Sequence, residues 1–156
     1  MNHNQDDQFI AFRLENEEFG IFITEINEII IEKEITPLAK TSKTILGMIN
    51  LRGVIIPIVD LRIHMNKAAT THKKNRIIIT TINNQKVGLL VDEVTKVLKI
   101  EEENIESCPE MLFQHDTNYV HYLYKSEGKV IVLLKLENLL ETNDLQSLSV
   151  ATKEGK

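Results

Sequence analysis

Short runs of Ile, Val and Leu follow one another along almost the whole chain, and they constrain the fold more than any other feature. The runs are closely spaced and rich in β-branched residues, which is typical of β-strands. We expect strands over residues 9–14, 19–23, 29–31, 48–51, 54–60, 76–82, 86–92, 94–100, 119–124 and 129–134. Because no helices alternate regularly with these strands, the pattern predicts an all-β protein built from small barrels.

Few helical segments are expected, and all of them are short. They are a helical turn from Thr24, a capped helix over 41–47 that Gly47 ends, a turn over 61–65 and a helix over 136–140. Pro57 lies within the strand 54–60 and cannot donate a ladder hydrogen bond, so this strand should have an edge or a bulge there. Residues 66–75 are polar and predict an exposed loop. The sequence shows no clear internal repeat.

The length of 156 residues, of which 42% are hydrophobic, suits a single domain with a core of its own. Residues 9–145 are expected to form it, between a disordered N-terminal segment 1–8 and a flexible tail 146–156. No apolar run reaches the ~18–20 residues that span a membrane, and the N-terminus lacks the apolar core of a signal peptide. The single cysteine excludes an internal disulfide. We therefore expect a cytoplasmic protein.

Charge is unevenly distributed along the chain. Residues 38–100 carry eleven basic and three acidic side chains, whereas residues 1–37 carry two and nine, and residues 101–156 carry five and eleven. The three parts could neutralise one another by packing together, or the middle part could present a basic face to an acidic partner. Both interpretations stay open, because sequence order does not say which charges share a surface.

No pattern typical of an active site is found. The five histidines form no metal-ligand motif, no serine lies in a nucleophile elbow, and the six glycines form no phosphate-binding loop. We expect no catalysis, no metal and no cofactor. Residues 38–100 contain no Phe, Tyr or Trp, which argues against a nucleic-acid partner, since single strands stack on aromatic side chains. An RNA-binding barrel and a hydrolase with an unrecognised site are the alternatives.

Arg52 and Gly53 separate two strongly apolar strands, so the sequence places a cation at a tight corner. A hairpin turn with Arg52 in solvent would account for this. However, Asn50, Asp60 and Arg62 lie close by in sequence, and a guanidinium fixed beside apolar surface is a common recognition anchor.

These residues also carry a resemblance to a known family. Residues 50–53 (Asn-Leu-Arg-Gly) and 56–62 (Ile-Pro-Ile-Val-Asp-Leu-Arg) resemble the signature of the CheW chemotaxis coupling proteins. Similar segments are 9–14, 18–21, 87–94 and 130–140, in the same order. The same module occurs in the regulatory domain of the CheA kinase and in CheV, which carry additional domains, so a free-standing module is the nearer match.

The resemblance implies a fold of two five-stranded SH3-like barrels that share a hydrophobic core, and an adaptor without catalytic activity. The partners it implies are the regulatory domain of the CheA histidine kinase and the cytoplasmic tip of methyl-accepting chemoreceptors. The protein would reach membrane receptor arrays through these partners, without inserting into the membrane. Whether copies bind one another, or other CheW-like domains, in rings is left open.

Matching by motif carries functional positions onto this chain residue by residue. The receptor-binding positions are Arg52, Asn50, Gly47 and Glu28, and Ile26 and Val97 match positions that bind either receptor or kinase. Receptor and kinase are expected to use different surfaces, because a coupler must hold both at once. The polar corner at Arg52 would serve the receptor, and exposed strand edges with apolar side chains would serve the kinase.

Two residues depart from the family pattern. Glu15 stands where the first hairpin often has Gly, and Tyr122 stands where the family usually has Gly. Because Gly at such a position indicates close backbone approach or an unusual φ, Tyr122 predicts either a more regular strand or a different partner surface.

Overall fold

The computed structural model describes residues 8–37, 45–65, 67–68, 74–107 and 119–139, and it is an all-β structure as expected. Its elements are β1 Gln8–Leu14, β2 Glu17–Phe22, η1 Ile23–Glu25, β3 Ile26–Ile31, β4 Thr36–Pro37, β5 Ile45–Leu51, β6 Val54–Asp60, α1 Leu61–His64, β7 Arg76–Ile82, β8 Gln85–Val91, β9 Glu93–Lys99, η2 Glu102–Asn104, β10 Ile105–Glu106, β11 Val120–Ser126, β12 Lys129–Leu134 and η4 Leu136–Asn138.

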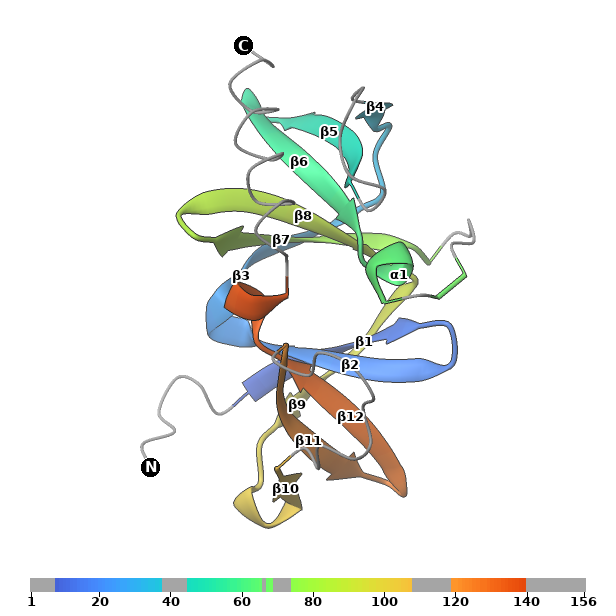
Figure 1. The fold of residues 1–156 in the computed structure, drawn as a ribbon, viewed down its shortest axis with the longest axis vertical. Coiled ribbons are helices and arrows are strands. Elements are labelled where there is room, and N and C mark those ends of the chain that lie inside the picture. The colour runs from blue at the N-terminus through green and yellow to red at the C-terminus, as the bar shows by residue number, and fades with distance from the viewer. Residues whose placement is uncertain (1–7, 38–44, 66, 69–73, 108–118, 140–156) are drawn as a thin grey trace.

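Two sheets form two small barrels that lie one above the other along the long axis of the molecule (Figure 1). The central barrel uses consecutive strands in the order β3-β7-β8-β6-β5-β4. The terminal barrel combines the N-terminal hairpin with the last four strands in the order β9-β1-β2-β12-β11-β10. Within the described ranges, each barrel has five strands of six or seven residues and one strand of two residues, β4 or β10. The five-stranded barrels implied by the resemblance are therefore present, each with a short sixth strand.

The two barrels share one topology although their strands come in a different chain order. In each barrel, two antiparallel hairpins meet through a parallel pair, which is β6 with β8 or β12 with β2. Gly88 of β8 lies opposite Ile58, and Gly20 of β2 lies opposite Leu133, so the two glycines occupy equivalent positions. The terminal barrel is thus a circular permutation of the central one. The sequence shows no clear repeat because this repeat lies in the strand pairing and not in residue identity.

Three apolar clusters fill the molecule, one inside each barrel and one between the barrels. The shared cluster comprises Phe12, Leu14, Phe19, Ile21, Ile45, Val59, Leu61, Ile78, Ile82, Val87, Leu89, Val91, Leu134, Leu136 and Leu139. Strand β7 shows why its residues 77–79 are all isoleucine: Ile78 faces the shared cluster, while Ile77 and Ile79 face the core of the central barrel. A strand segment that is covered on both faces has no polar side.

Some local expectations are corrected. The helix expected over 41–47 is wrong for its last residues, because β5 begins at Ile45 and Gly47 pairs with Pro37 and Ile58; residues 41–44 lie outside the described chain. Asn75, expected in an exposed loop, is buried. Residues 1–7 and the tail 146–156 also lie outside the described chain, and Gln8 belongs to β1.

Other local expectations are confirmed. Both expected hairpins around residues 15–16 and 83–84 form, and helical turns lie at residues 23–25, 61–64 and 136–138. Pro57 of β6 pairs with β5 on one side only, because the parallel pairing of β6 with β8 begins at Ile58. The strand therefore has a local edge at the proline, which cannot donate a ladder hydrogen bond.

The two departures from the family pattern have different structural outcomes. Glu15 has φ of 55°, the left-handed conformation that a glycine adopts without cost. Tyr122 occupies the position equivalent to Gly47, since one lies opposite Leu133 and the other opposite Ile58. A register shift lies next to both residues, but Tyr122 lacks the positive φ of Gly47, so its backbone conformation is the more regular of the two, as the first explanation for the tyrosine expects.

Candidate functional site

The Arg52 corner consists of residues 50–53, at the turn from β5 to β6, together with Glu28 of β3. Arg52 has φ of 51° and Gly53 has φ of 86°, as in the tight hairpin turns that require positive φ at both central positions. The side-chain Oδ1 of Asn50 accepts a hydrogen bond from the Gly53 amide at 2.9 Å and closes the turn. Left-handed backbone is uncommon for an arginine, so Arg52 carries some backbone strain.

Glu28 holds the arginine in place from the neighbouring strand. The Nη2 atom of Arg52 donates a hydrogen bond to Glu28 Oε1, and the two side chains are 69% and 34% exposed. Lys33 Nζ donates to the Asn50 carbonyl oxygen at 3.1 Å and adds a second cation. Guanidinium groups remain charged at all physiological pH values and present several donors, so the corner can bind a carboxylate or a carbonyl of a partner.

Exposed apolar side chains lie on two of the strands that form this corner. Val54 follows the turn and is 46% exposed, and Ile31 lies at the end of β3 and is 69% exposed. An anchored cation beside apolar surface is the composition expected of a protein interaction site rather than of a catalytic centre.

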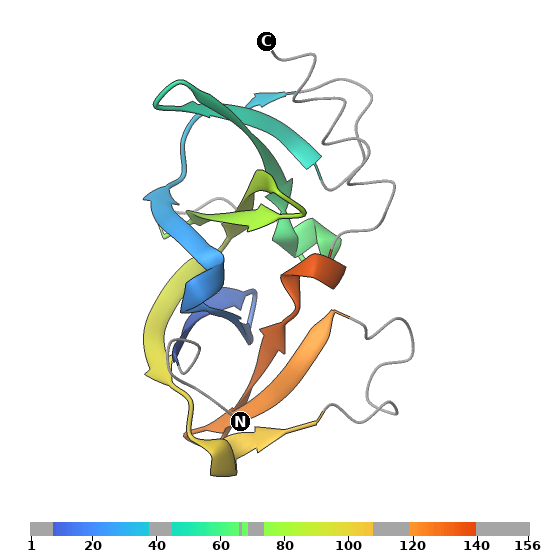
Figure 2. The same cartoon turned by 90° about the vertical axis from the view of Figure 1, so that its left-hand side faces the viewer.

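The structure brings together only part of the expected site. Glu28, Asn50 and Arg52 meet at the corner, whereas Gly47 is buried against the backbone of Thr36. Ile26 packs against the shared core at the start of β3. Val97, expected with them, belongs to the terminal barrel, where it is 54% exposed. Strands β3 and β9 nevertheless lie along the same side of the molecule and run away from each other (Figure 2).

A second corner with inverted charge lies in the terminal barrel and was not foreseen. Glu127 precedes Leu133 by the same six positions that separate Arg52 from Ile58, and its φ is also 51°. Glu127 Oε2 lies 3.9 Å from Lys96 Nζ of β9. Lys96 pairs with Ala11 as Glu28 pairs with Ile79, so the Glu127–Lys96 pair repeats the Arg52–Glu28 pair with both signs reversed. The sequence signal for this second corner was a charged residue followed by glycine between two apolar strands.

We call Glu127, Gly128, Lys96 and the exposed valines Val97 and Val130 the Glu127 corner. Val130 is 53% exposed, so each corner combines one opposite-charge pair with two exposed apolar side chains. A groove of about 500 Å³ lies beside this turn, and Leu98, Tyr124 and Val130 contribute to its walls.

An aromatic group lies elsewhere on the terminal barrel, around Tyr122. His121 stacks on Tyr122 with ring centroids 4.2 Å apart and meets the edge of Phe22 at 5.5 Å. Burial, and to a smaller extent the positive charge of Lys135, lowers the pKa of His121 below its ordinary value.

Charge pairing connects the basic middle of the sequence with its acidic flanks. Arg52 pairs with Glu28, Lys67 with Glu17, and Lys96 with Glu127, and each pair joins residues 38–100 to one of the flanks. Other ion pairs, such as those of Arg62 with Asp60 and Asp92, stay within residues 38–100, so neutralisation between the parts accounts for only some of the charge.

The described residues contain no group of three or more His, Cys, Asp or Glu side chains placed to hold a metal ion, and none of their helices is long and apolar enough to cross a membrane. The geometry defines a class of protein, which is a two-barrel interaction module with exposed, charged hairpin corners.

Comparison with known proteins identifies the family. The model of the CheW-like domain matches residues 8–144, so the chain belongs to the CheW-like domain family. The chain is 34% identical to chemotaxis protein CheW of Klebsiella aerogenes over 139 residues, covering 88% of this chain and 84% of that protein. It is 31% identical to CheW of Bacillus subtilis over 143 residues, covering 90% and 91%.

A solved structure of similar fold supports the same assignment. The scaffolding protein CheW of Thermoanaerobacter tengcongensis superposes with a TM-score of 0.80 at 36% identity, covering 89% of this chain and 95% of that one. The two-barrel fold implied by the sequence resemblance is confirmed.

Proposed function

We propose that this protein is a non-catalytic adaptor in bacterial chemotaxis, which couples methyl-accepting chemoreceptors to the CheA histidine kinase in a signalling array. Membership of the CheW-like domain family supports this role. The observation that carries the proposal within the chain is the Arg52 corner, where an exposed guanidinium is fixed on a left-handed turn by a carboxylate from another strand. The protein acts through binding free energy alone and reaches the membrane through its partners.

The receptor tip binds at the Arg52 corner. Arg52 provides a charge-assisted hydrogen bond, and the exposed side chains of Ile31 and Val54 provide apolar contact for a helical partner. Glu28 and Asn50 act by holding the arginine and its turn. Gly47 acts only through the backbone, since it is buried.

The kinase regulatory domain binds at the Glu127 corner. Because the two corners carry opposite charges on the same framework, one partner surface cannot suit both of them. We assign Val97, whose partner the sequence left open, to this kinase surface, because it follows Lys96 on β9 and its side chain is exposed. Two separate surfaces allow receptor and kinase to be held at once. Contacts between copies of the protein in rings remain a prediction from the family resemblance.

Binding titrations of two charge-reversed variants test this assignment. Arg52→Glu should abolish binding of a receptor cytoplasmic fragment and change kinase binding by less than about 1 kcal/mol, whereas Glu127→Arg should do the converse. Each titration is run at two salt concentrations, and the binding of both partners should weaken with added salt because each corner carries an exposed ion pair. Equal loss of both partners in either variant would refute the two-surface arrangement.

Arg52→Ala separates binding from folding. A hydrogen bond to a charged group contributes about 1.5–3 kcal/mol, and we expect a loss of receptor affinity in that range. The ion pair with Glu28 is largely exposed, so the free energy of unfolding should change by less than about 1 kcal/mol. A collapse of the melting temperature would instead show that Arg52 is structural.

A further inference from the structure

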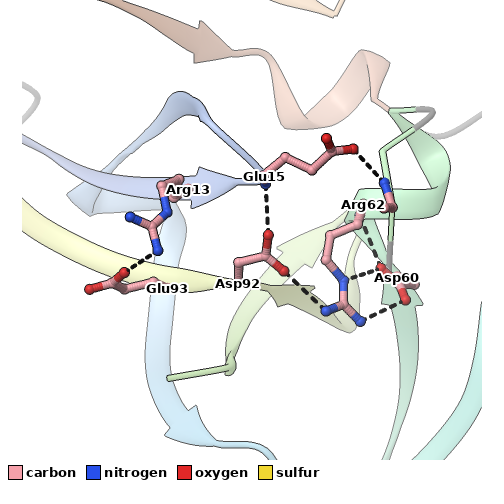
Figure 3. A network of polar contacts seen from close by, with 7 residues as sticks. Arg13, Glu15, Asp60, Arg62, Asp92 and Glu93 are labelled. Carbon is pink, nitrogen blue, oxygen red and sulfur yellow. Dashed lines mark hydrogen bonds and ion pairs between the residues drawn. The ribbon is translucent and has the colours of Figure 1, made fainter. Parts of the chain in front are cut away.

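A buried ionic network lies where the two barrels meet. Arg62 of α1 binds Asp60 twice, from Nε to Oδ1 at 2.9 Å and from Nη2 to Oδ2 at 3.0 Å, and its Nη1 donates to Asp92 Oδ1 at 3.0 Å (Figure 3). The three side chains are at most 5% exposed. Burial alone would lower the pKa of Arg62, but the bonds to both carboxylates outweigh it and raise that pKa.

The network joins residues of both barrels. Asp60 and Arg62 belong to the central barrel, while Asp92 is the residue at which the chain passes from β8 into β9 of the terminal barrel. The other oxygen of Asp92 accepts a hydrogen bond from the Glu15 amide at 2.7 Å, in the turn between β1 and β2. The Asp92 amide in turn donates to the Arg13 carbonyl at 3.1 Å. Arg62 thus fixes Asp92, where the chain passes between the barrels, and Asp92 in turn fixes the β1–β2 hairpin of the terminal barrel.

The same seam has further links across the barrels. Ala68, which follows α1, donates its amide hydrogen to Glu15 Oε1 at 2.5 Å, and Lys67 Nζ lies 2.6 Å from Glu17 Oε1. Glu15 takes part in two of these links while its backbone has φ of 55°. A strained backbone conformation persists only where the surrounding contacts hold it in place, and here Glu15 is held from two sides.

At the pseudo-equivalent seam, the residues that the structure describes form no such network. By the strand equivalence, Lys135, Glu137 and Thr24 stand where the first seam has Asp60, Arg62 and Asp92. Glu137 is exposed and Thr24 carries no charge, so these residues do not form a buried ionic group. Among the ion pairs of the described residues, only those of Arg62 have both side chains less than one-tenth exposed.

We propose that Arg62 is a positioning residue that fixes the orientation of one barrel relative to the other. The shared core is apolar, and apolar contact is non-directional, so it holds the barrels together without selecting one angle. Bidentate charge-assisted bonds are directional. A buried ion pair is weak evidence of a gain in stability, because desolvation offsets much of its attraction, and a role in conformational specificity accounts for its presence here.

The consequence for function follows from the path of the chain. Strand β9, which carries Lys96 and Val97, begins directly after Asp92. Arg62 therefore sets the geometry of the Glu127 corner relative to the Arg52 corner, although it touches neither. This second step rests on the proposed function, since it concerns how a receptor on one corner is placed relative to a kinase on the other.

The orientation is tested in the free protein by pulsed electron paramagnetic resonance. Spin labels are attached at Val54→Cys and Val97→Cys, one on each barrel, in a Cys108→Ser background. Arg62→Met and Asp92→Asn should broaden or shift the distance distribution between the labels. Arg13→Met is the matched control, because it breaks the 2.6 Å pair with Glu93 inside the terminal barrel and should leave the distribution unchanged.

Stability alone cannot mimic this result. If folded Arg62→Met and Asp92→Asn give the distribution of the unsubstituted protein, the proposal is overturned, even where their melting temperatures fall. If Arg62→Met does not fold, the distance distribution of Asp92→Asn decides the test, since this substitution keeps the side-chain volume and removes one charge. Arg62→Lys, which keeps the charge but not the bidentate fork, should give an intermediate distribution.

A second arm addresses the partners. In Arg62→Met, receptor and kinase should each bind alone within about twofold of the normal affinity, because neither site contains Arg62. Control of kinase activity by the receptor fragment should be lost or strongly reduced. Unchanged control would overturn this consequence. If the unsubstituted protein bound neither partner, the proposed function would fail while the label distances still decided the role of Arg62.

Discussion

Replacing Gly47 by alanine would show whether this family position acts through the backbone or through a partner. Gly47 has φ of 153°, a conformation that residues with a side chain rarely adopt, and the close approach of β4 leaves no room for a Cβ. An alanine Cβ would clash with the Thr36 carbonyl oxygen and would lie 2.7 Å from the Thr36 carbonyl carbon and 2.9 Å from Pro37 Cα. All of these atoms are backbone or Cα, so strand β4 itself would have to move.

The expected loss of stability has two parts. An unfavourable backbone conformation costs about 1–3 kcal/mol. Displacement of β4 would also break about two hydrogen bonds to β5, each of which contributes about 0.5–1.5 kcal/mol to stability. The free energy of unfolding should therefore fall by about 2–6 kcal/mol, and the melting temperature by about 2–4 °C for each kcal/mol in a domain of this size.

Urea denaturation of Gly47→Ala and of a control measures this loss. Gly53→Ala is the control, because Gly53 has φ of 86° but no atom within 4 Å of the built Cβ, so only the conformational cost of about 1–2 kcal/mol applies. Equal losses in the two variants would refute the argument that β4 blocks a side chain. Unchanged stability with lost receptor binding would show that Gly47 acts at the surface, as its motif position first suggested.

Three further predictions follow from other positions. Gly20→Ala places a Cβ 2.6 Å from Leu133 Cδ2 and should cost about 1–3 kcal/mol by overpacking in urea unfolding, and a negligible loss would contradict this packing. The lowered pKa of His121 means that the unfolded chain binds its proton more tightly, so stability should fall as pH drops through ~6.5, and His121→Gln should remove that dependence. An identical pH slope in the variant would argue against it. The purified protein should neither hydrolyse ATP nor bind it, and saturable micromolar binding in calorimetry would overturn the non-catalytic assignment.

The sequence predicted the strands well because their signals are local. Runs such as 54–60 and 76–82 are apolar enough and short enough to be strands in almost any environment. The Arg52 corner was also predicted, since Arg-Gly between two such runs indicates a hairpin with a cation at its tip. The error over residues 45–47 has a clear cause: Gly47 looks like a helix stop, but here glycine serves a close approach between strands.

Strand pairing between distant segments was decided by the tertiary structure. The hydrogen-bonded partners of β1 are β2 and β9, and β9 lies some eighty residues further along the chain. The sequence of a single strand does not predict such a partner, because every strand offers the same backbone hydrogen-bond donors and acceptors. For this reason the permuted repeat, and with it the equivalence of Arg52 and Glu127, could not be read from residue identities.

The sequence by itself determined an all-β chain of short hairpins, an exposed cation at one of their corners and, through its motifs, the family. Only the tertiary structure decided that Glu28 holds this cation, that a charge-inverted corner stands on the second barrel, and that Arg62 is buried between Asp60 and Asp92. The physical reason is the same in each case. Side chains pair when they are close in space, and the closure of a barrel brings together residues that are far apart in the sequence.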